Sequence, residues 1–531
     1  MHSSLADMEQ PASARYVGRP LTQPPSEGYQ RWVLVLLATV YAVNFIDRQI
    51  VSVLALDIKR DLGLSDADLG FLYGTAFGVF YALFGVPMGK LADSWNRVRM
   101  LTAGLALWSA MTALSGLTRT GGQLAAARVG VGIGEATASP CAYSLISDYF
   151  PRHKRATALA VYSSGMYIGA GLSLFIGAAV SQGWNRAYPD GWLGLVGWQA
   201  SFLVVGVPGL LLAIVVATLR EPVRGMSDGL HAPAAAHPFR EFWSEVMTIV
   251  PPLTLLSAAR LGMRTLIVNL IGLTIIAATA YALAAATGDT MQWLAVGIGS
   301  YAIFSWAATL RQRDPPAFAL TWGTPAFLAV LLGFGLISFV NYAVIFWSLP
   351  YAESVLGADK ATAGLVIGGG GAAGGFIGIN IGGRLADWLR TRNPSGRVTV
   401  ILFAALAPLI PLAISFTTSS LAVFYALVLP MTILSSLGLA ASAATSQDLV
   451  LPRMRGMATA SYFLSITMLG LALGPYTVGR ISEATGNLGM AVLLLVAVMP
   501  VSAAALIMLY RWLPAAEASV LERARAAGEP A

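Results

Sequence analysis

Fourteen long apolar stretches constrain this chain more than any other feature of its sequence. Each is close to the ~20 consecutive apolar residues that a helix needs to cross a bilayer. Only 11% of the residues are charged, whereas soluble domains carry about 25%. The sequence therefore predicts an all-α integral membrane protein with about 14 transmembrane helices. The predicted spans are 31–57, 67–90, 99–118, 121–147, 156–181, 197–219, 262–286, 290–310, 323–349, 361–387, 397–416, 420–446, 456–481 and 488–511.

The basic residues gather in the loops on one side of the predicted membrane. These loops contain Arg97, Arg99, Arg152, Lys154, Arg155, Arg390, Arg392, Arg397, Arg453 and Arg455. Short loops rich in Lys and Arg face the cytoplasm in membrane proteins. The same loops account for the net charge of +7, so we expect no nucleic acid partner. We expect a multi-pass protein of the plasma membrane (the inner membrane, if bacterial) with both termini cytoplasmic and membrane lipids around it.

Internal repetition divides the chain into two halves. GKLADSWNRVR (89–99) recurs as GRLADWLRTR (383–392), a spacing of 294 residues. SDYFPRHKRATA recurs as QDLVLPRMRGMATA at a spacing of 300, and AVNF recurs as FVNY at 297, which places Asn44 opposite Asn341. Three matches at nearly one spacing indicate two halves of six helices each, as in transporters built from repeats.

Two apolar spans, 262–286 and 290–310, have no counterpart in the repeat. Arg260, Arg264, Arg311 and Arg313 flank them, which is typical of a hairpin that leaves the cytoplasm and returns. The alternative, an amphipathic surface hairpin, needs a polar face that neither span has. The predicted organisation is a disordered cytoplasmic tail (1–30), a six-helix bundle (31–219), a cytoplasmic linker (220–261), the extra hairpin (262–314), a second six-helix bundle (315–513) and a cytoplasmic tail (514–531).

The repeated loop motif resembles the two copies of the loop motif of the major facilitator superfamily, and the resemblance covers about 31–219 and 323–513. NFIDR, ARVGVGIGEATASP and SDYFPRHKRATALAVYSSGMYIGAG further resemble the spinster family. The resemblance implies a major facilitator fold and a secondary active transporter that works by alternating access. It also implies a lysophospholipid-like or sphingosine-phosphate-like substrate and proton coupling. The extra hairpin departs from the animal members of the family.

Charged residues lie deep inside two predicted spans. Asp47 and Arg48 are in the first, and Arg128 and Glu135 are seven residues apart on one stripe of the fourth. A charge in the bilayer centre costs about 2.5–3.5 kcal/mol even on insertion scales, so such residues are functional by default. Neighbours on a helix do not face each other, so Asp47 and Arg48 each need a partner on another helix.

The first and fourth helices both line the central cavity in the resembled fold. We therefore expect one cluster of four charges in which Arg48 exchanges partners between a substrate and a carboxylate. Such an exchange changes the carboxylate's proton affinity, which would couple transport to protons. The alternative is a static salt-bridge network that fixes helix packing.

The second half lacks these charges. At the repeat spacing, Val344 and Ile345 stand opposite Asp47 and Arg48, and Glu135 falls near Ser435. The seventh core helix offers Asn341, Tyr342, Phe346 and Trp347 instead. We therefore expect a cavity with one charged wall and one aromatic, apolar wall, which suits an anionic or zwitterionic head group with an acyl tail. The alternative is that these aromatic residues face lipid.

The loop motifs predict a cytoplasmic gate formed by Asp93, Arg97, Arg155, Asp387 and Arg455. Asp93 and Asp387 end helices, and an acidic group at the N-terminus of a helix from the other half would be stabilised by that helix's dipole. Such a latch would hold one conformation and break in the other. The alternative is that the residues only set topology.

Glycine rows mark surfaces where helices can approach closely. Gly70, Gly74 and Gly78 repeat every four residues, as do Gly85 and Gly89. Rows of small residues let helices pack closely, which favours two halves that rock, although static packing explains the rows equally well.

Other classes of protein fit the sequence poorly. The four histidines lie near tails, linkers or loops, and the single Cys141 lies in an apolar span. We therefore expect no enzyme, no metal site and no cofactor. A channel would show a filter rather than repeated halves. The remaining alternative is a proton-coupled exporter of drugs or small organic anions from the same superfamily, but the GxxxGPxxGG motif typical of one such group is absent from the fifth span. We expect a monomer.

Overall fold

The structure, a computed structural model, describes residues 25–228 and 237–530. Within them, thirteen helices are long and apolar enough to cross a membrane, or fourteen if a helix pair bent by 98° is one span. The predicted fourth span is not among the thirteen. It forms two shorter helices that pack against its neighbours. The all-α membrane fold predicted from the sequence is confirmed.

The first half contains eight helices and one π-helical turn. They are α1 (Glu27–Leu62), α2 (Asp66–Gly70), the π turn η1 (Phe71–Thr75), α3 (Ala76–Ser94), α4 (Arg97–Ser115), α5 (Gly121–Glu135), α6 (Ala138–Tyr149), α7 (Arg152–Ala187) and α8 (Gly197–Ala217). We call 27–219 the N-terminal half.

A middle segment follows and leads into the second half. It consists of η2 (Met226–Asp228), α9 (Pro238–Ile249), α10 (Leu253–Arg260), α11 (Met263–Thr287), α12 (Thr290–Arg313) and α13 (Pro315–Leu320). The C-terminal half, 325–518, consists of α14 (Pro325–Ser354), α15 (Lys360–Arg390), α16 (Gly396–Leu406), α17 (Leu409–Ser415), α18 (Leu421–Ser436), α19 (Gly438–Asp448), η3 (Pro452–Met454), α20 (Arg455–Ser465), the π turn η4 (Ile466–Leu471), α21 (Gly474–Thr485), α22 (Leu488–Leu494), η5 (Leu495–Val498) and α23 (Met499–Ala518). The short α24 (Val520–Ala526) follows it.

The break between α5 and α6 follows from the local sequence. Gly130, Gly132 and Gly134 precede it, and glycine is a weak helix former. Pro140 lies in the first turn of α6, where its missing N–H needs no intrahelical partner. The helix can therefore end at Glu135 and begin again at Ala138 without leaving a backbone donor unpaired there.

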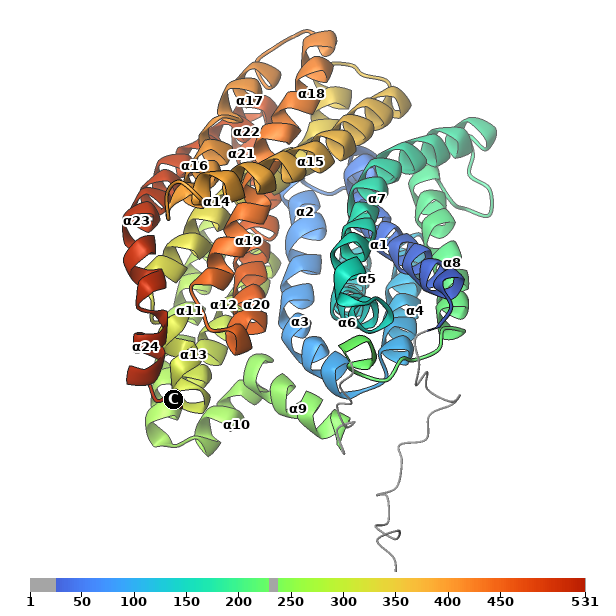
Figure 1. Cartoon of the computed structure of the whole chain (residues 1–531). Coiled ribbons are helices and arrows are strands. Elements are labelled where there is room, and N and C mark those ends of the chain that lie inside the picture. Colours follow the sequence, from blue (N-terminus) through green and yellow to red (C-terminus); the bar gives the residue numbers. More distant parts are fainter. Residues whose placement is uncertain (1–24, 229–236, 531) are drawn as a thin grey trace, which may run out of the picture.

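The bundle has two distinct ends. We call the end that carries Arg97, Arg155, Arg397 and Arg453 the basic end. α9, α10 and α24 lie there, at the bottom of Figure 1. We call the other end, which carries the loops after α1, α7 and α17, the opposite end.

The two halves meet at the opposite end. Lys360 pairs with Asp57 at 2.7 Å, Ser482 donates to the Asp66 carboxylate at 2.8 Å, and the Ala67 amide donates to Glu483 at 2.6 Å. Among residues 25–228 and 237–530, the hydrogen bonds and ion pairs found between the halves all lie in this part of the bundle. At the basic end the halves diverge (Figure 1).

The glycine row on α2, η1 and α3 lies in this interface. A Cβ on Gly70 would come within 3.0 Å of Pro475 and Tyr476, and a Cβ on Gly74 would come equally near the Leu471 carbonyl. Both distances are shorter than real Cβ contacts. The row therefore lets the halves approach backbone to backbone.

The segment predicted as the linker, 220–261, contains two α-helices. α9 and α10 lie within it and pack against α3, α11 and α12. Lys90 pairs with Glu241 at 3.5 Å, and the rings of Trp95 and Phe239 lie 5.1 Å apart. The sequence PFREFWSEVMTI places apolar residues at helical spacing, and that pattern explains why α9 forms.

The predicted tails also differ at their inner boundaries. α1 begins at Glu27, four residues before the predicted start, because Ser26 caps it by accepting from the Tyr29 amide. Residues 1–24, most of the predicted N-terminal tail, lie outside the described residues. α23 continues beyond the predicted boundary at 513 to Ala518, and α24 follows it.

The hairpin formed by α11 and α12 gives a direct test of topology. Thr290 is exposed at the turn between them, and Arg313 is exposed at the basic end of α12. In a Cys141→Ala background, we expect a membrane-impermeant thiol reagent added to whole cells to label Thr290→Cys but not Arg313→Cys. Labelling of Arg313→Cys alone would show that the hairpin has the reverse orientation.

Candidate functional site

A buried ion pair joins α1 and α5. The Arg48 guanidinium donates to the Glu135 carboxylate at 2.8 Å. Arg48 is 7% exposed and Glu135 is 1% exposed. Charged groups this deep are costly unless they are paired. The partner that the sequence requires for Arg48 on another helix is therefore present on α5.

Three aromatic rings surround the Arg48 guanidinium. Its central carbon lies 4.8 Å from the centroid of Phe45, 4.7 Å from that of Phe77 and 4.9 Å from that of Tyr81. The Phe77 ring also lies 5.3 Å from the Arg128 guanidinium. Ring faces attract cations, more strongly where water is excluded. The rings therefore stabilise two neighbouring arginines that would otherwise repel each other.

Asp47 and Arg128 are close but not paired through their side chains. Arg128 donates to the backbone carbonyl of Asp47 at 3.2 Å, and no Arg or Lys nitrogen of the described residues forms an ion pair with the Asp47 carboxylate. Thr112 and Trp108 are its polar neighbours. The structure thus brings the four predicted charges together but gives only Arg48 and Glu135 a direct ion pair.

Several polar atoms of this cluster have no hydrogen-bond partner within the described chain. They are Asn44 Nδ2, both carboxylate oxygens of Asp47, Arg48 Nε, Arg128 Nε and Nη2, and Glu135 Oε1. Buried polar groups in folded proteins are almost always satisfied. The cluster therefore has hydrogen-bonding capacity that a substrate group, water or a proton can use.

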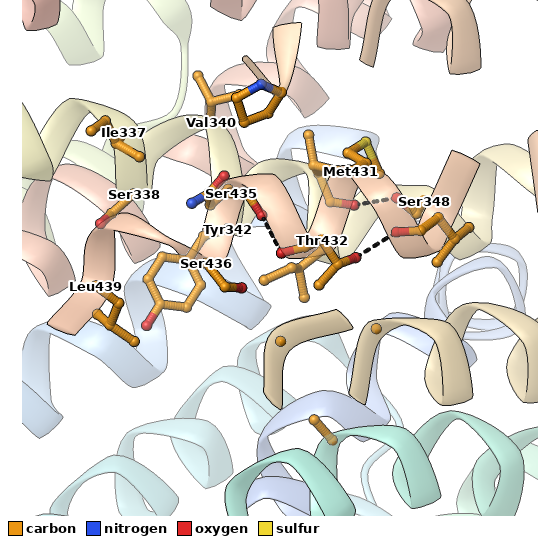
Figure 2. A pocket seen from close by; sticks show the side chains of 18 of the residues that line it. Ile337, Ser338, Val340, Tyr342, Ser348, Met431, Thr432, Ser435, Ser436 and Leu439 are labelled. Carbon is orange, nitrogen blue, oxygen red and sulfur yellow. Dashed lines mark hydrogen bonds between the residues drawn. The ribbon is translucent and has the colours of Figure 1, made fainter. Parts of the chain in front are cut away.

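A cavity lies beside this cluster, mostly within the C-terminal half. It has a volume of about 270 Å³. Its walls come from α1, α7, α14 to α18 and neighbouring segments, and no charged side chain is among its lining residues. Figure 2 shows part of its polar side. The polar side chains on its walls are Gln49, Tyr167, Ser338, Asn341, Tyr342, Ser348, Thr432, Ser435 and Ser436.

Asn341 and Tyr342 line the cavity, where the sequence places them, and Ser435 lies at the repeat position of Glu135. The four charges, however, do not form a cavity wall. Phe45 and Gln49, which flank the pair Asp47 and Arg48 on α1, line it instead. The expectation of a charged wall is therefore corrected, because α1 turns Arg48 toward α5 and the aromatic rings rather than into the cavity.

Phe346 and Trp347 also differ from expectation. Both are fully buried, so they do not face lipid. Phe346 stacks on Tyr73 with centroids 4.5 Å apart, and Trp347 donates to the Pro475 carbonyl at 2.9 Å. Phe346 therefore joins the two halves, Trp347 braces the C-terminal half internally, and neither lines the cavity.

The predicted gate residues of the first half form a network within that half. Arg97 is fully buried, pairs with Asp148, and donates to Glu221 at 2.7 Å. Arg155 donates to the Ser147 carbonyl at 2.7 Å. Asp93 is exposed. The charged groups that act electrostatically on its carboxylate are Arg224, Lys90 and Arg97.

The second half repeats this network. Arg397 pairs with Asp448 and, at 2.9 Å, with Asp387. Glu517 accepts from Arg390 at 2.9 Å, whereas Glu221 of the first network accepts from Arg97. Arg455 is exposed at the start of α20. None of these contacts joins the two halves, so a latch between Asp93 and the other half stays a prediction for the opposite conformation.

A further ion pair at the basic end braces the middle segment. Arg453 in η3 contacts Asp314, the residue after α12, at 2.7 Å. The hydrogen bonds from Arg453 lower the pKa of the Asp314 carboxyl below its usual value. The end of α12 is therefore attached to the C-terminal half.

Sequence analysis missed the ion pair that joins the halves at the opposite end. Lys360, 6% exposed, contacts Asp57 at 2.7 Å and Glu353 at 3.4 Å. Asp57 and Lys360 are 303 residues apart and lie at the ends of spans. Each looks like an ordinary flanking charge in the sequence, so no pattern could have paired them.

We expect Lys360→Met to open the opposite end. Removing one partner from a buried ion pair costs about 3–5 kcal/mol, and that cost falls only on the conformation in which the pair is buried. Distances between spin labels at Asp190→Cys and Ser419→Cys in a Cys141→Ala background should therefore lengthen. Lys154→Met, at an exposed pair with Glu27, is the matched control. Unchanged distances in the Lys360 variant would show that the pair does not hold the halves together.

Comparisons with known proteins agree with this architecture. A family model described as Major Facilitator Superfamily matches residues 37–475. An MFS-type efflux pump of Mycolicibacterium smegmatis (strain ATCC 700084 / mc(2)155) is 29% identical over 477 residues, which cover 88% of this chain and 90% of the pump. Protein spinster of Drosophila melanogaster is 25% identical over 463 residues, which cover 86% of this chain and 63% of that protein.

Two further matches differ in how much of this chain they cover. A probable L-galactonate transporter of Escherichia coli (strain K12) is 32% identical over 185 residues, 35% of this chain and 38% of that protein. The crystal structure of a bacterial homolog to the human lysosomal transporter Spinster, in an inward-facing and unoccupied conformation, superposes with a TM-score of 0.65. It is 25% identical, and the match covers 94% of this chain and 98% of that one.

Proposed function

We propose that this chain, which belongs to the major facilitator superfamily and resembles its spinster transporters, moves an amphiphilic, lipid-like substrate by proton-coupled alternating access. The substrate class is that of lysophospholipids or sphingosine phosphates. One observation carries the proposal. An uncharged, mostly apolar cavity adjoins a buried arginine–carboxylate pair.

The two parts of the site suit the two parts of such a molecule. The cavity's apolar walls, with hydroxyls from Thr432, Ser435 and Ser436, fit a hydrocarbon chain and its linkage. Tyr342 lines the cavity and is an electrostatic neighbour of Arg48. A phosphate group that reached past Tyr342 would meet a guanidinium, whose planar fork binds phosphate in a bidentate manner.

Competition for Arg48 would provide the coupling. In the present conformation Arg48 is held by Glu135. An anionic head group that took Arg48 would leave Glu135 buried without its counter-ion, and a buried carboxylate without a counter-ion binds a proton readily. Asp47, which has no ion pair among the described residues, is a second proton carrier in this scheme.

We place the basic end in the cytoplasm, with both termini, and the protein in the plasma membrane as a monomer. The positive-inside pattern supports this orientation. In this orientation the basic end faces the cytoplasm and the opposite end is closed. The conformation is then inward-facing, like that described for the bacterial Spinster homolog. In the present conformation the predicted gate residues contact partners within their own half. They are candidates for contacts between the halves when the basic end is closed.

Transport by purified protein in liposomes tests the proposal. We expect uptake of a labelled lysophospholipid or sphingosine phosphate, and a dependence of its accumulation on a pH gradient. Labelled sugar acids and cationic drugs serve as the comparison panel. Transport of a member of that panel with no transport of any lysolipid would overturn the substrate class.

A second candidate is an exporter of apolar drugs. The absence of charge on the cavity walls formed by the described residues and the similarity to the M. smegmatis efflux pump favour it. The two candidates differ at Arg48. A neutral drug should still be transported by Arg48→Ala protein, whereas an anionic amphiphile should not.

A further inference from the structure

The two halves of the bundle meet along two seams. One seam runs between the span that contains α2, η1 and α3 and the span that contains α20, η4 and α21, and the other runs between α7 and α15. A substrate with an acyl chain could pass from the bilayer to the cavity through either seam. The two seams differ in whether the middle segment covers them.

The middle segment covers the first seam. Ala302 and Trp306 of α12 and Ile249 of α9 share one buried apolar cluster with residues of both halves. A Cβ on Gly299 of α12 would come within 3.0 Å of Met468 in the C-terminal half and near Val79 in the N-terminal half. α12 therefore lies across this seam and separates it from lipid.

One backbone carbonyl of the C-terminal half accepts hydrogen bonds there from both the N-terminal half and the middle segment. Ala472 O accepts from Thr75 of the N-terminal half at 2.6 Å and from Gln292 of α12 at 3.4 Å. It follows η4, a π turn that packs against the π turn η1. The cover is thus in contact with both sides of the seam.

The hairpin is fixed to the C-terminal half. Its turn residue Asp289 accepts from Tyr476 at 2.7 Å and lies 3.7 Å from Arg480. Trp293 packs edge-on against Tyr476. Asp314, after α12, contacts Arg453 at the basic end. These attachments lie on the C-terminal half at both ends of α12, so the cover stays on this seam when the halves move.

Within the described chain, no helix of the middle segment packs extensively against α7 or α15, which form the second seam. α7 and α15 run antiparallel. Gln182 donates to Asp359 near the opposite end, and Gly171 packs against Gly368 further along. A Cβ on Gly375 would come within 3.0 Å of the Tyr167 ring. The contact with Tyr167 is the nearest to the basic end of these three.

A thin aromatic wall separates the cavity from the lipid at this point. Tyr167 and Gly375 both line the cavity. The Tyr167 ring meets the Phe376 ring at a centroid distance of 6.5 Å, and Phe376 is 51% exposed. One ring contact therefore lies between the cavity and the exposed side chain of Phe376.

We propose that the seam between α7 and α15 is a lateral portal for one acyl chain, closed by Tyr167 and Phe376, and that the α11–α12 hairpin confines lipid access to this seam. The inference rests on the amphiphilic substrate class proposed above. The absence of side chains at Gly371 and Gly375 leaves room for the chain to pass between the helices. The head group then stays near the basic end until it meets the cluster.

Photo-crosslinking at matched exposed positions tests the portal. The crosslinking residue p-benzoylphenylalanine is placed at Phe376 or at Ile275, which is 61% exposed near the middle of α11. The probe is an alkyne-tailed lysophosphatidylcholine or lysophosphatidylglycerol in liposomes. We expect saturable labelling at 376 that an excess of unlabelled lysolipid reduces at least about fivefold, and only unsaturable labelling at 275.

Each outcome decides the inference. Labelling that is equally unsaturable at both positions, in protein that transports the lysolipid, would overturn the portal while leaving the proposed function intact. Competed labelling at 275 would overturn the role of the hairpin. Wild-type protein that neither binds nor transports any lysolipid would overturn the proposed function, and the portal with it.

A size change at the wall gives a second test. Gly371 lines the cavity and Gly369 does not, and nothing lies within 4 Å of the position that a Cβ would take on either residue. Gly371→Phe should slow uptake of a long-chain lysolipid at least about tenfold, and Gly369→Phe should leave it unchanged. Equal effects of the two changes would contradict a chain-binding surface on this face of α15.

Discussion

Gly74→Val is expected to shift the protein away from the conformation seen here and to reduce transport severely. A Cβ at this position would come within 3.0 Å of the Leu471 carbonyl, which belongs to a backbone and cannot rotate away. Overpacking of this kind costs about 1–3 kcal/mol, which corresponds to an about 5- to 150-fold change in a conformational equilibrium. The cost falls on the state in which the opposite end is closed. Spin-label distances at Asp190→Cys and Ser419→Cys should lengthen accordingly.

Gly85→Val is the matched change on the same membrane span, Asp66–Ser94. In this conformation nothing lies within 4 Å of a Cβ at Gly85 or Gly89, so the variant should keep the present distances. When the basic end closes, that face of α3 approaches the other half, and the added side chain should hinder closure. The two variants should therefore shift the conformational equilibrium in opposite directions. A shift in the same direction would contradict rocking about this glycine row.

Neutral replacements in the charged cluster are expected to separate binding from proton coupling. Asp47→Asn and Glu135→Gln keep the shapes of the side chains but cannot change charge. Both should still bind substrate and should lose the response of transport to a pH gradient. Asp47→Asn should be the better tolerated, because the Asp47 carboxylate has no ion pair among the described residues, whereas Glu135 is paired with Arg48.

Replacements of Arg48 should affect binding itself. Arg48→Ala leaves Glu135 buried without its partner, which costs about 3–5 kcal/mol in comparable ion pairs. Arg48→Lys should recover binding only in part because the planar fork is lost. Asp190→Asn, in an exposed loop, is the control for expression and folding. If both neutral carboxylate variants accumulate substrate against its gradient like the wild type, the cluster is structural and the coupling lies elsewhere.

The sequence predicted the architecture well because repetition and span length are local patterns. The spacing between Asp93 and Asp387 located both loop motifs, and the repeat located Asn341 on the cavity wall. Burial of charge also predicted that Arg48 needs a partner on another helix, and Glu135 provides it.

The sequence could not predict how each helix is rotated about its axis. Asp47 and Arg48 were expected on a cavity wall, but Phe45 and Gln49 line the cavity instead. A stripe of residues shows which side chains share a face but does not show what that face contacts. The pairing of Asp57 with Lys360 depends on the relative placement of two halves, which no local pattern encodes.

The shared carbonyl of Ala472 bears on the speed of the transport cycle. If the halves separate at the opposite end, the bond from Thr75 must break, and a buried acceptor left without a donor costs about 1–3 kcal/mol. Gln292 moves with Ala472, because the hairpin is attached to the C-terminal half, and it can shorten its 3.4 Å contact as Thr75 leaves. We expect Gln292 to replace Thr75 as the donor when the halves separate, so Gln292→Leu should slow this separation and lower the population of the conformation in which the opposite end is open.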